Sequence, residues 1–174
     1  PKPISPYGAS KYIVEPVLNA YYHAFGLESV ALRYFNVYGP NDEQQGTRAV
    51  PKWAKAALVG EPLELFWRGE QKRDYIYVKD IARANLASFK NCTGARVYNV
   101  GTGTGVWMKD VVRELEGLVG RKLKIRHIGN RLGDPTFAMA DIGKIRKELH
   151  WQPQTDLATG LSLTMDYFRR KLQK

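Results

Sequence analysis

Hydrophobic residues recur at helical spacing in the first part of this chain. Ile13, Val17, Leu18 and Tyr21 lie three and four positions apart, and this pattern predicts a helix over 5–25 that ends at Gly26. Pro16 lies inside that helix, where it removes an N–H donor and predicts a kink. The turns that precede the kink are expected to keep their helical geometry.

The rest of the chain alternates between short apolar runs and longer amphipathic segments. The apolar runs predict strands over 29–35, 63–67, 75–78, 96–100 and 123–128. Helices are predicted over 49–59, 80–90, 107–119, 142–149 and 157–172, and 37–47 is a loop by its Gly, Pro, Asn and Gln content. The residues expected in the core of the later helices are Ile81, Ala84, Leu86, Ala87, Trp151, Leu161, Met165 and Phe168.

Composition narrows the class of protein. With 174 residues, 44% hydrophobic and 25% charged, the chain is typical of a globular domain, and it has no apolar run long enough to span a membrane. Cys92 is the single cysteine, so we expect no internal disulfide, no metal site and a cytoplasmic location. The net charge of +10 is compatible with nucleic acid, but the basic residues are spread along the chain, which favours an anionic small molecule.

The segment around Tyr7 is the best candidate for chemistry. Tyr7 and Lys11 are four residues apart, and on a helix they share one face. A lysine cation beside a tyrosine favours the phenolate, which can act as a base. The alternative is that both side chains belong to an ordinary solvated helix face.

The glycine-rich segment 101–105 follows a predicted strand and precedes a predicted helix, which is the order of a dinucleotide-binding motif. Its spacing is G-x-G-x-G rather than G-x-G-x-x-G, and the next predicted strand ends without a carboxylate to hold a ribose. We therefore expect a structural turn here rather than a cofactor site.

Four motifs together resemble a known family. They are PYGASK at 6–11, RYFNVYGP at 33–40, RDYIYVKD at 73–80 and YNVGTG at 98–103. In this order they resemble the extended short-chain dehydrogenase/reductase family, in particular its NAD-dependent nucleotide-sugar epimerases and dehydratases, and among these the UDP-glucose 4-epimerases. The family's glycine-rich NAD-binding turn lies well upstream of the tyrosine, so the chain resembles the C-terminal half of such an enzyme.

The resemblance implies an α/β fold, consisting of the C-terminal portion of a Rossmann-like parallel sheet and a smaller α/β substrate-binding domain. It assigns 1–36 and 72–119 to the NAD-binding domain, and 37–71 and 120–174 to the nucleotide-sugar domain. The strands and helix faces that would adjoin the other half lead us to expect an oligomer, such as a homodimer.

The resemblance also assigns the site. Tyr7 and Lys11 would be catalytic and would contact NAD together with Tyr34 and Phe35, and no metal is implied. The substrate-binding residues would be Asn36, Val50, Phe66, Arg73, Tyr75 and Arg131, with the two arginines on the diphosphate and Val50 and Phe66 against the nucleobase. An alternative for Arg73 is an ion pair with Asp74 or Asp80, and one for Arg131 is a pair with Asp134.

The implied reaction is epimerisation of a nucleotide sugar of the UDP-glucose/UDP-galactose type, through transient oxidation at C4 with NAD. Two alternatives remain: a dehydratase of the same family, and a non-catalytic nucleotide-sugar-binding or assembly module. Glu64 and the pair Trp67-Arg68 differ from the small or glycine-rich residues that many relatives have there. This difference leaves the identity of the nucleobase open.

Overall fold

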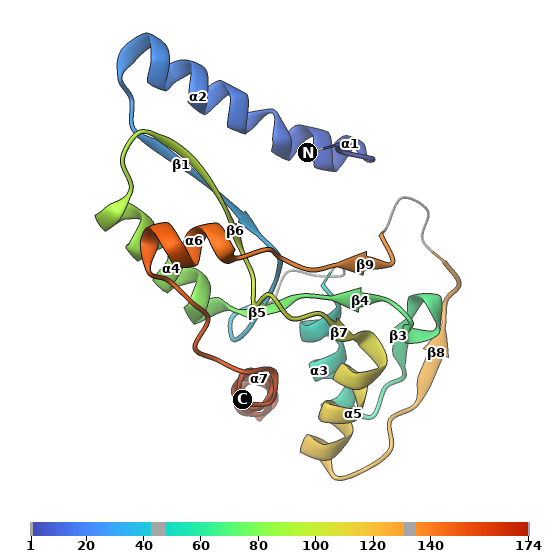
Figure 1. Ribbon diagram of the computed structural model, residues 1–174. Coiled ribbons are helices and arrows are strands. Elements are labelled where there is room, and N and C mark those ends of the chain that lie inside the picture. The colour runs from blue at the N-terminus through green and yellow to red at the C-terminus, as the bar shows by residue number, and fades with distance from the viewer. Residues whose placement is uncertain (1, 43–47, 131–134, 174) are drawn as a thin grey trace.

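A computed structural model describes residues 2–42, 48–130 and 135–173 (Figure 1). The elements, in chain order, are α1 (Pro6–Tyr12), α2 (Val14–Phe25), β1 (Ser29–Tyr34), β2 (Asn36–Tyr38), α3 (Ala49–Val59), β3 (Leu63–Leu65), the 3-10 helix η1 (Phe66–Gly69), β4 (Lys72–Arg73), β5 (Tyr75–Tyr77), α4 (Val78–Asn91), β6 (Ala95–Val100), β7 (Val106–Trp107), α5 (Met108–Val119), β8 (Ile125–His127), β9 (Phe137–Ala138), α6 (Gly143–Leu149) and α7 (Leu157–Leu172).

The first predicted helix is divided in two by Pro16. α1 ends at Tyr12 and α2 begins at Val14, so the proline occupies the first turn of α2, where its missing N–H is tolerated. A proline ring clashes with the carbonyl four residues earlier, which is that of Tyr12, the last residue of α1. The break therefore comes just before the proline, and the turns that carry Tyr7 and Lys11 remain helical, as predicted.

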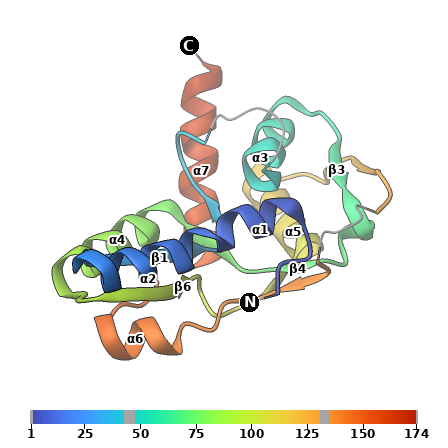
Figure 2. The same cartoon turned by 90° about the horizontal axis from the view of Figure 1, so that it is seen from above.

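A parallel pair of strands, β1 and β6, forms one part of the molecule. Ser29 pairs with Ala95 and Tyr34 with Val100. α2 lies across one face of this pair, and α4 and α6 lie on the other (Figures 1 and 2). Arg33 on β1 donates two hydrogen bonds of 2.6 and 2.7 Å to the carboxylate of Glu15 on α2. The Arg33 guanidinium lowers the pKa of Glu15 from its ordinary value, so this ion pair fastens the helix to the strand.

Helices α3, α5 and α7 form the second part, beside the parallel pair β3–β8 and the three-stranded sheet β7-β4-β9 (Figure 1). The parallel pair β2–β5 joins the two parts, because β2 follows β1 after a single residue. Tyr38 at the end of β2 packs against Gly160 of α7, where an added Cβ would lie 2.1 Å from its hydroxyl oxygen. A side chain at position 160 would therefore separate α7 from the β2–β5 pair.

Each part has its own hydrophobic core. The first contains Ile76, Ile81, Ala84, Tyr98, Val100, Ala140, Ile142, Ile145, Leu149 and Trp151. The second contains Tyr38, Val50, Trp53, Ala54, Ala56, Ala57, Leu63, Leu65, Tyr75, Tyr77, Met108, Val111, Val112, Leu115, Leu123, Leu161, Met165 and Phe168. Helix α5 packs with α3 and α7, and α6 contacts β6.

Most predicted elements are present, with three corrections. The strand predicted over 63–67 ends at Leu65, because Phe66–Gly69 forms the 3-10 helix η1. The segment predicted as a loop from position 37 begins with the strand β2, because Asn36–Tyr38 pairs with Tyr75–Tyr77. Leu86, predicted to face the core, is 53% exposed, whereas Ile81 and Ala84 on the same helix are buried. Positions 81, 84 and 88 follow the helical period toward β1 and β6, and position 86 points to the opposite side.

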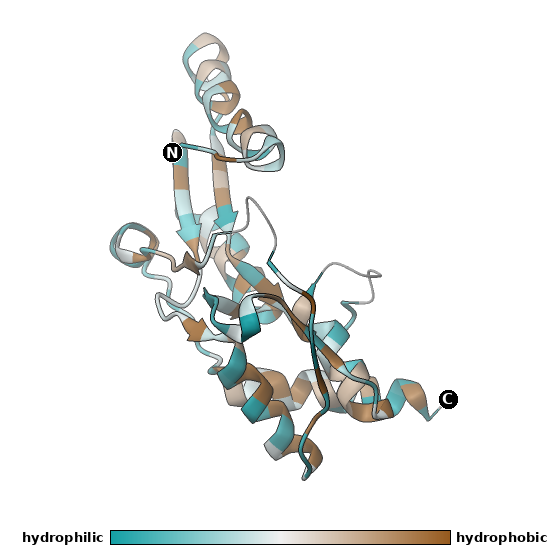
Figure 3. Cartoon of the chain, turned by 90° about the vertical axis from the view of Figure 1, so that its right-hand side faces the viewer, coloured by the Kyte–Doolittle hydropathy of each residue, from teal (hydrophilic) through white to brown (hydrophobic). Residues whose placement is uncertain are grey.

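Helices α1 and α2 contain no buried residue. Ile13 is 62% exposed and Phe25 77% exposed, and apolar residues recur along both helices (Figure 3). Apolar surface of this kind favours association. We therefore expect the chain to sediment as concentration-dependent oligomers, and a variant with Ile13→Glu and Phe25→Glu to shift toward the monomer. A monomer at all concentrations in sedimentation velocity would contradict this expectation.

Candidate functional site

Tyr7 and Lys11 lie on one face of α1, as their spacing predicts. Ser5 caps this helix by accepting a 3.0 Å hydrogen bond from the backbone N–H of Gly8, and Pro6 occupies the first turn. The ammonium of Lys11 lies 5.4 Å from the centre of the Tyr7 ring. Tyr7 is 72% exposed, so its phenol is open to a ligand. The pair therefore combines an exposed phenol with a nearby cation.

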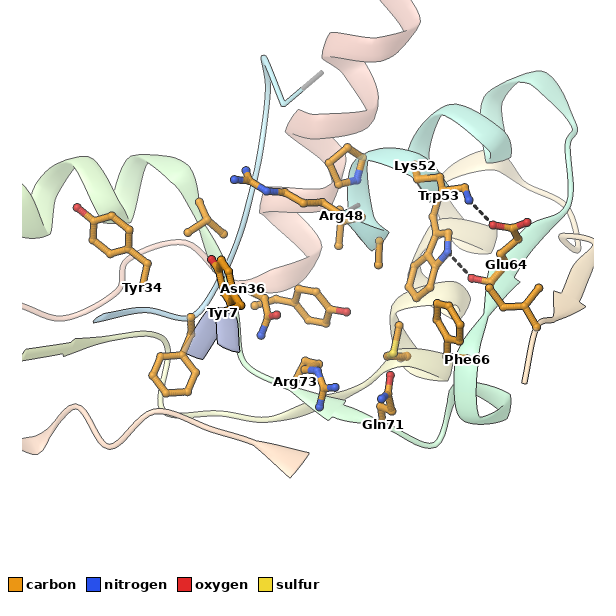
Figure 4. A pocket seen from close by; sticks show the side chains of 18 residues that line it. Tyr7, Tyr34, Asn36, Arg48, Lys52, Trp53, Glu64, Phe66, Gln71 and Arg73 are labelled. Atoms are coloured by element: carbon orange, nitrogen blue, oxygen red, sulfur yellow. Dashed lines mark hydrogen bonds and ion pairs between the residues drawn. The ribbon is translucent and has the colours of Figure 1, made fainter. Parts of the chain in front are cut away.

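A cavity of about 560 Å³ opens beside Tyr7 and runs toward β3 and α3 (Figure 4). Apart from Lys11, the predicted site residues in the described chain line it: Tyr7, Tyr34, Phe35, Asn36, Val50, Phe66, Arg73 and Tyr75. Arg131 lies outside the described residues. The volume of the cavity is within the usual range for a small-molecule site.

The middle of the cavity is formed where β1, β2, β4 and β5 meet. The amide Nδ2 of Asn36 donates a 2.9 Å hydrogen bond to the backbone oxygen of Asp74. Its backbone N–H donates to the same oxygen at 3.0 Å. Arg73 and Tyr75, the residues on either side of Asp74, are both buried. These bonds therefore fix Asn36 relative to two further predicted substrate-binding residues.

The side chain of Asp74 is fully buried and organises the glycine-rich turn. It accepts hydrogen bonds from the backbone N–H groups of Thr102, Gly103 and Ala140, and from the Thr102 hydroxyl. A Cβ at Gly101 would lie 2.7 Å from an Asp74 oxygen and 2.6 Å from the Ala140 Cβ. This glycine is therefore needed for close packing, which supports a structural role for the turn.

The alternative prediction for Arg73 is an ion pair with Asp74 or Asp80, and the structure shows what each of these carboxylates binds. The carboxylate of Asp74 accepts the bonds just described, and that of Asp80 pairs with Arg83 and accepts from the backbone N–H groups of Gln154 and Thr155. Arg73 donates from Nη1 to the backbone oxygen of Lys72 at 3.4 Å. Arg73 is buried and lines the cavity.

The far end of the cavity contains residues that were not predicted. Together with others along the cavity, the lining residues that were not predicted are Val37, Arg48, Ala49, Pro51, Lys52, Trp53, Glu64, Gln71, Met108 and Ile128. Helical spacing could have indicated Trp53, since it is three residues after Val50 on α3 and shares its face. The indole Nε1 of Trp53 donates a 2.9 Å hydrogen bond to the backbone oxygen of Glu64, which joins α3 to β3.

Glu64 is the carboxylate at this far end (Figure 4). Its two oxygens form ion pairs with Lys52 of α3 and Arg126 of β8. Hydrogen bonds from Lys52 and Arg126 lower the pKa of Glu64 from its ordinary value, so the carboxylate is ionised near neutral pH. A separate ion pair joins Arg48 to Asp42 at 3.1 Å.

Comparison with known proteins shows the family of this chain. The sequence profile of the "NAD dependent epimerase/dehydratase family" matches residues 1–101, which is more than half of the chain. The chain belongs to this family. The match contains the Tyr7–Lys11 pair and the strands β1, β2, β4 and β5 that surround the middle of the cavity.

Relatives in the epimerase/dehydratase family align with nearly the whole chain. A UDP-glucuronate 4-epimerase of Thermodesulfobacterium geofontis is 32% identical over 98% of the chain and 52% of its own length. A UDP-glucose 4-epimerase of Mycolicibacterium smegmatis is 33% identical over 98% of the chain and 55% of its own length. The chain thus spans about half the length of these curated relatives.

Solved structures agree in fold. The UDP-glucose 4-epimerase of Thermotoga maritima, solved with UDP-glucose, is 37% identical with a TM-score of 0.94, over 99% of this chain and 56% of that one. The Thermus thermophilus UDP-glucose 4-epimerase, solved with NAD, is 33% identical with a TM-score of 0.90, over 97% and 55%. The predicted α/β, Rossmann-like class is confirmed, and NAD is the cofactor of this family.

Other types of site find no support in the described ranges 2–42, 48–130 and 135–173. Within them no three His, Cys, Asp or Glu side chains are grouped so as to hold a metal ion. None of the helices described there has the length and apolar character needed to cross a membrane. His23, His127 and His150 are exposed and lie outside the cavity lining.

Proposed function

We propose that this chain carries the catalytic tyrosine and the nucleotide-sugar site of an NAD-dependent 4-epimerase acting on a UDP-glucose type of substrate. The observation that supports this most is the single cavity that begins at Tyr7 and continues past Arg73 and Tyr75 to Phe66. These residues come from α1, β4, β5 and η1, so the tertiary fold brings them together.

The predicted site residues have distinct roles in this proposal. Tyr7 takes the proton from the sugar 4-hydroxyl and returns it after the sugar has turned over, and the Lys11 cation stabilises the phenolate during the transfer. Arg73 binds diphosphate oxygens through its planar guanidinium, and Tyr75 donates a hydrogen bond to them. Asn36 contacts the phosphate or the sugar, and Val50 and Phe66 lie against the nucleobase.

The residues near Tyr7 also suit the cofactor. Tyr34 and Phe35 stand at the carboxyl end of β1, line the same cavity as Tyr7, and lie where ligands bind in open α/β sheets. Lys11 supplies a cation for the hydroxyl groups of a nicotinamide ribose. NAD, when bound, supplies the capacity to accept a hydride and return it. With the hydride transferred by the cofactor, the role of Tyr7 is limited to proton transfer at the sugar 4-oxygen.

Native mass spectrometry with NAD and UDP-galactose tests the proposal directly. Binding of both ligands, together with conversion of UDP-galactose to UDP-glucose, is the expected result for an assembly that contains a complete site. Binding of the nucleotide sugar without turnover would restrict this chain to substrate binding. If neither ligand binds, the proposal is wrong for this polypeptide.

Arg73→Ala is expected to weaken binding of UDP by about 10- to 100-fold, because charge-assisted hydrogen bonds to phosphate are lost. Isothermal titration calorimetry with UDP and with uridine measures the change. Since uridine has no phosphate, its affinity should change far less than that of UDP. The matched control is Arg113→Ala, which removes an exposed arginine of α5 that pairs with Asp110. Equal affinity of wild type and Arg73→Ala for UDP would exclude the clamp.

A dehydratase is the second candidate. It is favoured by a trifunctional enzyme of Arabidopsis thaliana, named in part as a UDP-glucose 4,6-dehydratase, which is 34% identical over 95% of the chain. Product analysis separates the two, because a dehydratase removes water from the sugar and an epimerase does not.

The proposal also includes the oligomeric state and the location of the protein. The exposed faces of α1 and α2 support a homodimer or other oligomer, and the single Cys92 supports a cytoplasmic location.

A further inference from the structure

The three-stranded sheet β7-β4-β9 (Figure 1) has one face that does not line the cavity. Lys72 and Arg73 are successive residues of β4, so their side chains point to opposite faces, and it is Arg73 that lines the cavity. Lys72 pairs with Trp107 of β7 on one side and with Phe137 of β9 on the other. Residues directly opposite each other on neighbouring strands share a face, so these three side chains form a row across the outer face of the sheet.

An ammonium lies between two aromatic rings in this row. Nζ of Lys72 is 5.6 Å from the centre of the Trp107 ring and 6.0 Å from the centre of the Phe137 ring. Nζ of Lys109, at the start of α5, is also 5.6 Å from the centre of the Trp107 ring. A Cβ at position 105 would lie 3.0 Å from the Lys72 side chain, so Gly105 leaves room for the lysine stem. The outer face therefore presents a ring, a cation and a second ring in order.

The rings and the cations of the outer face remain available to a ligand. Trp107 is 40% exposed and Phe137 is 56% exposed. Within the ranges that the structure describes, neither Lys72 nor Lys109 forms an ion pair with a carboxylate. Their charge adds to that of a chain with 27 basic and 17 acidic residues. Such a face favours a ligand that carries both rings and negative charges.

We propose that the outer face of β7-β4-β9, with Lys109 beside it, binds single-stranded nucleic acid, a function beyond that of the cavity. In a single strand each phosphate lies between two nucleosides, so its order of ring, anion and ring complements this face. Bases stack on Trp107 and Phe137, and the phosphates between them bind Lys72 and Lys109. Neighbouring strands are about 4.8 Å apart, so the rings on the two outer strands are roughly 10 Å apart and each takes its own base.

Other occupants complement the outer face less well. An acidic peptide would meet the lysines, but it does not supply a ring on each side of an anion. The bases of a duplex are already stacked and paired, so the two aromatic rings would gain no contact from it. A lipid surface requires a wider apolar area than two rings separated by a lysine.

The alternative is that the rings and lysines only hold three short strands together through cation–π contacts. In that case removal of a ring lowers stability and leaves nucleic-acid affinity at the level that the general positive charge provides. The two roles are separated by measuring affinity and folding on the same variants.

Fluorescence anisotropy with a labelled single strand of about 12 nucleotides, prepared as RNA and as DNA, tests the proposal. At least one of the two strands is expected to bind the wild-type chain about 10-fold or more tightly than the duplex of the same length and sequence. The ratio between RNA and DNA shows which of them the face prefers. Equal affinity for strand and duplex, or no binding of either strand, would overturn the proposal.

Removal of one ring at a time is the decisive step. Trp107→Ala and Phe137→Ala are each expected to weaken single-strand binding by about 5- to 100-fold, because the stacking of one base is lost. Trp107→Phe should retain most of the affinity, since it keeps a ring. Lys72→Gln should weaken binding and reduce the slope of log K against log salt by about 0.7, the value for one phosphate contact on a single strand.

Phe89→Ala and Lys90→Gln are matched controls on α4, because Phe89 is 89% exposed and Lys90 is exposed as well. They remove a ring and a charge of the same kind from another surface. Phe89→Ala should leave the affinity unchanged, and Lys90→Gln should leave the salt slope unchanged. If Trp107→Ala and Phe137→Ala bind as tightly as the wild type, only the general charge attracts the strand and the proposal is wrong. Circular dichroism of each variant separates a lost contact from a lost fold.

Discussion

Replacing Tyr7 by phenylalanine is expected to reduce turnover of the nucleotide sugar by about 10²- to 10⁴-fold in the NAD-loaded protein. The change removes only the hydroxyl that transfers the proton and leaves the ring beneath the Lys11 ammonium. Binding of UDP should stay within about 3-fold of the wild type, because none of its phosphate contacts is altered. Conversion of UDP-galactose, followed with UDP titrations on the same samples, measures both quantities.

Tyr12→Phe provides the control for this change. Tyr12 is the last residue of α1 and does not line the cavity, so turnover should be unaffected. Wild-type turnover of Tyr7→Phe would contradict the assignment of Tyr7 as the base. A parallel loss of UDP binding would show that the variant acts through the structure of α1 instead.

Asp74→Ala is expected to lower the free energy of unfolding by about 3–5 kcal/mol. The Asp74 side chain is fully buried, and its removal leaves the N–H groups of Thr102, Gly103 and Ala140 without their acceptor. Asp74→Asn should lose less, because its amide oxygen still accepts. Urea unfolding followed by circular dichroism gives the three values.

Asp110→Ala is the matched control for Asp74, since Asp110 forms an exposed i,i+3 pair with Arg113 on α5. A change within about 0.5 kcal/mol is expected there. If Asp74→Ala also stays within that range, the carboxylate does not organise the glycine-rich turn. A large loss for both variants would instead indicate that the assay responds to any change of charge.

Local patterns in the sequence were sufficient for most of the helices. α3 ends at Val59 and is capped by Gly60, which adopts a left-handed conformation with φ of 83°, and α7 occupies the predicted residues 157–172. Both have an apolar face and a clear end signal, so their bounds depend little on the rest of the molecule. The short strand β2 was missed because its pairing with β5 is a tertiary contact, and the Gly39-Pro40 sequence that follows is typical of a loop.

The candidate site was predictable to the extent that its residues belong to family motifs. Tyr7, Asn36, Arg73 and Tyr75 each lie in one of those motifs, and the structure brings them to one cavity. The cluster at the far end could not be found in this way. Glu64 and Arg126 are 62 residues apart, and they meet only through the register of β3 with β8, which no local pattern specifies.

The long separations between paired strands also determine how this chain can fold. Arg33 and Asn99, neighbours across β1 and β6, are 66 residues apart, and every parallel pair in the described ranges joins segments that are distant in sequence. Such contacts require the closure of long loops before they contribute stability, so the contact order is high and refolding is expected to be slow. During synthesis, β1 cannot pair with β6 until β6 has emerged from the ribosome. The apolar residues of β1 remain exposed until then and can bind chaperones.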